Sequence, residues 1–252
     1  MFLILSQKQI EDIKVCGHIL AEVFDSVLKL VKPGVSTFEI NQFIESELKK
    51  RGAASSFLNY EVGGEFYPSS SCISKNADLV HGLPSKEDVL KEGDIVSIDA
   101  GAYFKGVHTD MARTVGVGKI SENDHELIDI TKKCLEIGVS AAKPDQNIGM
   151  IGKRIEEEAN KRGLSVVKEL VGHGIGTELH MEPQIPNYGD GLLGPSIKNG
   201  MALAIEPMLS TGSNKVKTKE DGWTVTMKDG SNCAHFEDTV VIIDGKTVIV
   251  TR

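Results

Sequence analysis

The chain has 252 residues, of which 40% are apolar and 25% charged, and its formal net charge is −8. This length and apolar content suit one large compact domain or two fused halves with an ample core. The acidic balance argues against a dedicated nucleic-acid binder, because such proteins usually present a basic surface to the phosphates.

Residues 1–14, MFLILSQKQIEDIK, hold only four apolar residues after Met1 before polar residues take over. That run is too short for a signal peptide or a membrane span, so we expect a globular cytoplasmic protein without membrane contact. The basic run 215–219 is interpreted as a solvated loop in preference to a docking site. The sequence has no CxxC pair, which disfavours a thiolate zinc site or a disulfide framework; its cysteines are Cys16, Cys72, Cys134 and Cys233.

Hydrophobic periodicity predicts a helix over residues 7–31, which the following Lys-Pro-Gly at 32–34 ends. A second helix is expected to open at Ser36 or Thr37, with Glu39 near its first turn, and to run to Lys50. The other predicted segments are a β region at about 55–118, helices at 122–142 and 147–162, and a second β region from 165 onward.

Two helices followed by strands therefore occur twice along the chain. The helix stops KPGVS at 32–36 and KPDQN at 143–147 lie at matching points. No linker or low-complexity segment separates the repeats. We predict an α+β fold in which 1–252 is a single domain with two pseudo-symmetric halves, about 1–120 and 121–252.

Two aspartates interrupt apolar strands in the stretch IVSIDAGAYFKGVHTDMARTV, residues 95–115. If the turn uses residues 104–105 or 103–106, Asp99 and Asp110 lie directly opposite each other. Like charges in that position destabilise a strand pair, and burial makes the conflict worse. A divalent cation would resolve it; a shared proton, or one acid pointing to solvent, remain alternatives.

The second β region adds three possible ligands in apolar or glycine-rich settings: His173 in VGHGIG, Glu206 in LAIEPM and Glu237 in AHFEDTVV. Together with the two aspartates they make four carboxylates and one imidazole. Two divalent cations would neutralise the four negative charges. Oxygen-rich ligation with one nitrogen suits Mn, Fe, Co or catalytic Zn.

These five residues and their neighbours resemble the type I methionine aminopeptidases. The resemblance covers nearly the whole chain, through HGLP (81–84), GDIVSIDAG (93–101), TDMART (109–114), VGHGIG (171–176), HMEPQIPN (180–187), IEPM (205–208), DGWTV (221–225) and HFEDTV (235–240). It implies a pita-bread fold and a metal-dependent enzyme that removes the initiator methionine from nascent chains when the second residue is small. By resemblance, Asp99 would bind one of two metal ions (Co, Mn, Fe or Zn), His173 and Glu206 would bind the other, and Asp110 and Glu237 would bridge them.

The resemblance also implies roles outside the metal set. Glu206 would shuttle the proton, His180 would donate to the developing oxyanion or the scissile amide, and His81 would contact the substrate backbone. The methionine pocket would be formed by Tyr67, Cys72 and Trp223, since sulfur and aromatic rings suit a thioether.

Some positions depart from the family's pattern or receive no role. Thr177, Leu179 and Met181 differ from many bacterial members, which puts the pocket lining in question. Phe57 and Tyr60 lie in a segment that is hard to register, so we assign them no pocket role. Of the remaining histidines, His18, His108 and His125 are expected to be surface or local hydrogen-bonding groups, and His235 to be structural.

The rival enzyme is an X-Pro dipeptidase of the same fold, although those proteins normally carry a further N-terminal domain. A catalytically inactive binding protein of the same fold is the rival from another class, although such proteins usually lose metal ligands. A nucleotide site is disfavoured because GHGIG is neither GxGxxG nor a P-loop. We expect a monomer that acts on nascent chains, with transient ribosome contact possible and no nucleic acid as substrate.

Overall fold

The computed structural model describes residues 4–252. Its helices are α1 (Gln7–Val27), a short 3-10 turn η1 (Leu28–Leu30), α2 (Thr37–Lys50), α3 (Glu122–Ala141) and α4 (Gly149–Lys161). Serine side chains cap α1, α2 and α3, and in α2 the expected Glu39 completes a capping box with Ser36. The first helix ends earlier than predicted, because the chain tightens into η1 before the Lys-Pro-Gly stop. The fourth begins at Gly149, two residues later than predicted. Within residues 4–252, no helix is both long and apolar enough to cross a membrane.

A large antiparallel sheet runs through the molecule, with strands in the order β1-β6-β7-β16-β11-β9-β10. In addition, β17 pairs with β16, and β4 pairs with β6. Its members are β1 (Ala54–Ser55), β4 (Cys72–Lys75), β6 (Ile95–Phe104), β7 (Val107–Gly116), β9 (Gly172–Gly174), β10 (Met181–Ile185), β11 (Ala202–Ile205), β16 (Glu237–Ile243) and β17 (Lys246–Ile249). Smaller sheets join β15 (Cys233–His235), β12 (Met208–Ser210) and β8 (Ser165–Val166); β13 (Val216–Thr218), β14 (Val225–Met227) and β5 (Asp78–Val80); and β2 (Glu61–Val62) with β3 (Glu65–Phe66).

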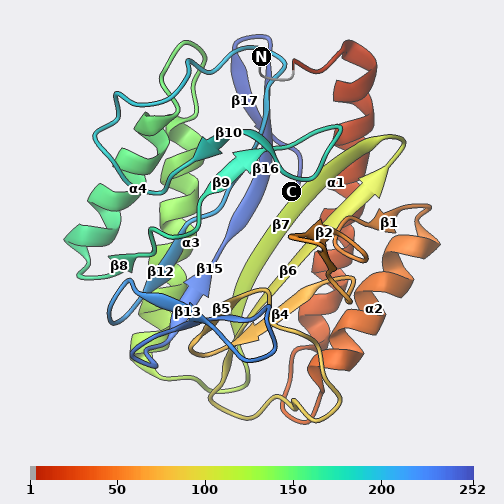
Figure 1. The fold of residues 1–252 in the computed structure, drawn as a ribbon, viewed down its shortest axis with the longest axis vertical. Helices are drawn as coiled ribbons and strands as arrows, with labels where there is room; N and C mark the ends of the chain where they lie inside the picture. Colours follow the sequence, from red (N-terminus) through yellow and green to blue (C-terminus); the bar gives the residue numbers. More distant parts are fainter. Residues whose placement is uncertain (1–3) are drawn as a thin grey trace.

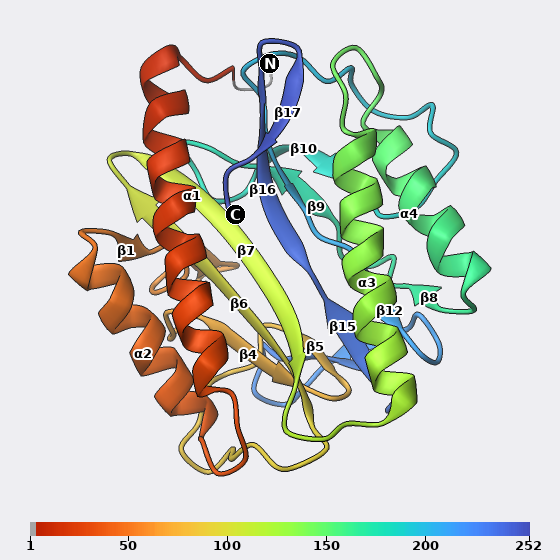
Figure 2. The same cartoon turned by 180° about the vertical axis from the view of Figure 1, so that it is seen from behind.

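The two halves of the chain meet in the middle of the large sheet, where β7 pairs with β16. Figure 1 shows α1 and α2 beside the first half's strands and α3 and α4 beside the second half's. Figure 2 shows that α1 and α3 both cover the rear face of the sheet. Each helix pair buries its own apolar core against the sheet, one with Leu20 and Phe24, the other with Leu127 and Ile155. The opposite face of the sheet is left to form a site.

The β6–β7 hairpin corrects the predicted register. Its two-residue loop is Lys105-Gly106, with φ of 49° and 85°, because the tight hairpin turn that suits twisted strands needs positive φ at both positions. Asp99 therefore pairs with Ala112, and Asp110 with Gly101. The prediction that the two aspartates lie directly opposite was wrong by two residues. A shift of two keeps both side chains on one face of the sheet, so they are diagonal neighbours.

Candidate active site

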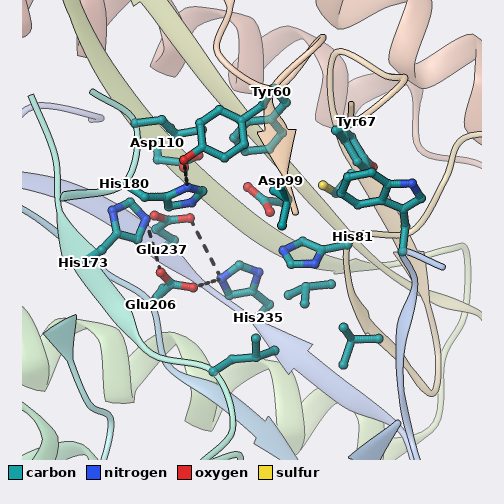
Figure 3. A pocket seen from close by; sticks show the side chains of 18 of the residues that line it. Tyr60, Tyr67, His81, Asp99, Asp110, His173, His180, Glu206, His235 and Glu237 are labelled. Carbon is teal, nitrogen blue, oxygen red and sulfur yellow. Dashed lines mark hydrogen bonds and ion pairs between the residues drawn. The ribbon is translucent and has the colours of Figure 1, made fainter. Parts of the chain in front are cut away.

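The five side chains predicted as metal ligands, four carboxylates and one imidazole, converge from both halves of the chain onto one face of the large sheet (Figure 3). Asp99 and Asp110 come from β6 and β7, His173 from β9, and Glu237 from the first position of β16. Glu206 follows β11 directly. All five line a single cavity of about 710 Å³.

Glycines on either side of His173 explain why that strand can lie where it does. A Cβ at Gly172 would stand 2.4 Å from the Ala204 carbonyl oxygen, and one at Gly174 would stand 2.4 Å from the Glu182 carbonyl oxygen. Only glycine permits this approach of β9 to β11 and β10. The two glycines thus let β9 lie close to its neighbours, and this places the His173 imidazole beside the carboxylates that those strands carry.

The tautomer of His173 is set by its own backbone. Its Nδ1 lies 2.9 Å from the Gly174 carbonyl oxygen, which can only accept, so Nδ1 carries the hydrogen and Nε2 presents a lone pair to the cavity. That Nε2 lies 3.6 Å from Glu206 Oε1. Two acceptors therefore face each other, an arrangement that favours a cation between them.

Carboxylate oxygens in the cavity also lack hydrogen-bond donors. Oδ1 of Asp99 and Oε1 of Glu237 are buried and have no hydrogen-bond partner among the residues described. Burial and neighbouring acids raise the pKa of Asp99, Glu206 and Glu237, and burial raises the pKa of Asp110 to about 7. Burial also lowers the pKa of His173 to about 4, so the ring is neutral and able to ligate.

Three overlapping sets of side chains have ligand atoms close enough to hold a metal ion. They are Asp99, Asp110 and Glu237; His173, Glu206 and Glu237; and Asp110, His173 and His180. Glu237 belongs to the first two sets, and Asp110 links the first to the third. The donor chemistry, buried orphan oxygens plus one oriented imidazole, fits divalent metal ions at adjacent positions.

Aromatic and sulfur-containing side chains form a wall of the cavity beside Asp99. Cys72 is the strand partner of Asp99 in the β4–β6 pair. The Tyr67 ring lies edge-on to Trp223, with centroids 5.2 Å apart. Phe57, to which we assigned no role, lines the cavity and packs edge-on to Tyr67 at 6.5 Å. Leu179 also lines it.

Two more histidines, to which the resemblance gives substrate-binding roles, line the cavity. His81 follows β5 with a positive φ of 57°, and Gly82 beside it packs against the Ile73 carbonyl. His180 precedes β10, and its ring centroid is 4.5 Å from that of His173. Surrounding protein and neighbouring imidazoles lower the pKa of His180 to about 3, so it is a neutral hydrogen-bonding group.

Besides Phe57, two further side chains line the cavity although the sequence analysis gave them no role in the site. Tyr60 lines the cavity, and its hydroxyl lies 2.8 Å from Nδ1 of His180. His235 also lines the cavity, beside Glu206 and Glu237, where we expected only a structural histidine. No local pattern marks Tyr60, but His235 lies two residues from Glu237 on an extended segment, a spacing that places two side chains on the same side.

Comparison with known proteins agrees with this geometry. Residues 11–244 match the model of metallopeptidase family M24. Methionine aminopeptidase 1 of Bacillus subtilis is 43% identical over 252 residues, covering 100% of both chains. The crystal structure of methionine aminopeptidase from Thermotoga maritima superposes with a TM-score of 0.97, at 40% identity and with 100% of both chains covered. Prolidase from Pyrococcus furiosus has a TM-score of 0.78 at 23% identity over 99% of this chain and 65% of its own, which shows a common fold.

The chain belongs to metallopeptidase family M24, and its fold is the α+β pita-bread fold that the sequence predicted. Within that family it groups with the methionine aminopeptidases, as the full-length relatives show. Membership of this family implies a divalent metal cofactor.

Proposed function

We propose that this protein is a metal-dependent aminopeptidase that removes the initiator methionine from nascent polypeptides whose second residue is small. One observation carries the proposal: two ligand sets that share Glu237 lie in a cavity with an aromatic and thiol wall. The full-length similarity to methionine aminopeptidases supports the same activity. Since each half of the chain supplies ligands, we propose that 1–252 acts as one catalytic domain.

Two divalent ions would be held by the five predicted ligands. Asp99 would bind one ion, His173 and Glu206 would bind the other, and Asp110 and Glu237 would contact both. Mn, Fe, Co and Zn suit this oxygen-rich set with one imidazole. When bound, such ions supply Lewis-acid polarisation of the scissile carbonyl and a water of lowered pKa.

The side chains around this centre would move protons and position the peptide. Glu206 would accept a proton from the attacking water and deliver it to the departing amine. His180, neutral and held by Tyr60 through Nδ1, would donate its Nε2 hydrogen to the oxygen that gains charge. His81, which lines the same cavity, would contact the peptide near the scissile nitrogen.

The methionine side chain would occupy the space between Tyr67, Cys72 and Trp223. These rings and the buried thiol offer an apolar, polarisable surface to a thioether. Leu179 adds an aliphatic side to the pocket, whereas Thr177 and Met181 are not among the lining residues. We therefore propose that, of the three departures from the family pattern, Leu179 alone touches the substrate.

The rival activities are not favoured. The identity to prolidase is 23%, against 43% and 40% to the two methionine aminopeptidases. The inactive binding protein is disfavoured by five convergent ligand side chains. We propose nascent chains in the cytoplasm as the substrate, with a monomeric enzyme and transient ribosome contact.

A panel of matched tripeptides tests the proposal. The metal-restored protein should release the first residue of Met-Ala-Ser and leave Leu-Ala-Ser, Met-Leu-Ser and N-acetyl-Met-Ala-Ser intact. Equal release from the leucine peptide would contradict methionine specificity. Release from Met-Leu-Ser would contradict the limit on the second residue.

A further inference from the structure

His235 is a buried histidine whose ring nitrogens make no hydrogen bond to the described residues. It ends β15, is 1% exposed, and both of its ring nitrogens lack a partner among residues 4–252. The backbone is fixed, since the His235 N–H donates to Thr114 Oγ1 at 2.9 Å and the carbonyl accepts from the same hydroxyl at 2.8 Å. An unpartnered buried imidazole is unfavourable unless the site uses it.

The ring is directed at two of the proposed metal ligands. Its Nε2 lies 3.5 Å from Glu206 Oε2 and 3.9 Å from Glu237 Oε2, as the dashed lines in Figure 3 show. Both neighbours are acceptors, which favours the hydrogen on Nε2.

His235 therefore differs from His173, although both touch Glu206. The Gly174 carbonyl takes the Nδ1 hydrogen of His173, which leaves its Nε2 as an acceptor facing Oε1. No such acceptor constrains His235 in the described part of the chain. Nor does His235 belong to any three-residue ligand set found among the described residues. One histidine is thus arranged to ligate and the other to donate.

We propose that His235 is a positioning residue that donates Nε2–H to Oε2 of Glu206 and keeps Oε1 of that carboxylate directed at the His173 side of the site. This inference rests on the metal site of the proposed function. The present 3.5 Å separation closes to hydrogen-bonding length with a small rotation of the Glu206 side chain. An outer hydrogen bond of this kind orients a ligating carboxylate and strengthens metal binding.

Metal titration of two substitutions tests this role without any peptide. His235→Gln keeps an N–H donor, and His235→Leu removes it while filling a similar space. Isothermal titration of metal-free protein with Co²⁺ should give a Kd within about threefold of the parent for the Gln form. The Leu form should bind about 10- to 100-fold more weakly. His125→Leu, an exposed histidine-to-leucine change on α3, is the matched control and should bind as the parent does.

The same His235→Leu change made in a Glu206→Gln variant distinguishes an effect through Glu206 from a loss of packing. If His235 acts through Glu206, adding His235→Leu there should weaken binding by much less than it does in the parent. Equal Co²⁺ affinity of the Leu form and the parent would overturn the inference. So would a Gln form as weak as the Leu form while circular dichroism shows both folded, or a parent that binds no metal. Loss of peptide cleavage with the titration pattern intact would instead sink the proposed function and leave His235's role standing.

Discussion

The hydroxyl of Tyr60 lies 2.8 Å from Nδ1 of His180, across 120 residues of chain, and the two rings stand edge to face with centroids 4.9 Å apart. Because His180 is neutral, a phenol that donates to Nδ1 leaves the ring hydrogen on Nε2. The contact therefore holds the imidazole at one angle beside His173, and it suits the tautomer that presents Nε2–H to the cavity.

Tyr60→Phe removes this hydroxyl and keeps the ring. We expect kcat for Met-Ala-Ser to fall roughly fivefold, because one hydrogen bond contributes about 1 kcal/mol. Metal content, measured by elemental analysis, should not change. Tyr103→Phe, at the exposed end of β6, is the control. An unchanged kcat in Tyr60→Phe would show that His180 is oriented without the phenol.

Substitution of a proposed ligand should remove metal and activity together. Asp99→Asn and His173→Ala are expected to abolish turnover and most metal uptake, while circular dichroism reports a folded chain. His180→Ala should instead lower kcat and leave the metal in place. Full activity in metal-replete Asp99→Asn would contradict the paired-ion arrangement, and an empty site in His180→Ala would make His180 a ligand.

The buried carboxylates make the stability of metal-free protein depend on pH. Burial raises the pKa of Asp110 from 3.8 to about 7 and raises that of Asp99 as well. The folded state then binds more protons than the unfolded chain between these values. The free energy of unfolding therefore falls as the pH rises through that window. A cation binds the deprotonated carboxylates, so its stabilising effect should grow with pH.

Thermal unfolding with and without excess Mn²⁺, between about pH 5 and about pH 8, measures this effect. The rise in Tm on adding Mn²⁺ should widen steadily across the range. The exposed-site variant Asp129→Asn should show the same widening, and Asp110→Asn should show less of it. A Tm rise independent of pH in the parent would contradict a cation held by these acids.

The β2–β3 hairpin projects from the cavity wall between Tyr60 and Tyr67. Its Val62 and Phe66 are 53% and 58% exposed, and Val62 lines the cavity. The base is closed by the Tyr67 N–H, which donates to the Tyr60 carbonyl at 2.9 Å. Replacing residues 61–66 with Asn-Gly keeps this base as a tight hairpin.

The shortened hairpin should raise KM for peptides of five or more residues by roughly fivefold, the equivalent of about 1 kcal/mol of lost apolar contact. KM for Met-Ala-Ser should change less, because a tripeptide offers fewer residues that could contact the hairpin. Similar losses for both lengths would mean that the hairpin supports Tyr60 or Tyr67 and does not touch the substrate.

Much of the fold, and the candidate ligands, could be predicted from short stretches of sequence. The helix starts at Ser36 and Ser121 follow from capping chemistry, which involves residues three apart. The candidate ligands Asp99, Asp110 and Glu237 could be picked out because acidic residues are rare inside apolar strands, and the structure buries all three. Residue type and setting sufficed there, without knowledge of the exact strand register.

Contacts between distant segments could not be predicted in the same way. The register error in β6–β7 arose because Lys105 adopts a positive φ that its residue type does not announce. Tyr60 and Phe57 reach the cavity only through packing against Tyr67 and His180. The direction of His235 toward Glu206 depends on the antiparallel pairing of β15 with β12, which sets His235 opposite Met208 and is not visible in the local sequence.

Metal-dependent methionine release tests the central claim most directly. The protein is stripped of metal, Mn, Fe, Co or Zn is restored in turn, and free methionine from Met-Ala-Ser is measured beside cleavage of Gly-Pro. We predict methionine release only after metal is restored, with Gly-Pro untouched. Cleavage of Gly-Pro would make the protein an X-Pro peptidase, and metal binding without cleavage of either peptide would contradict an enzymatic role.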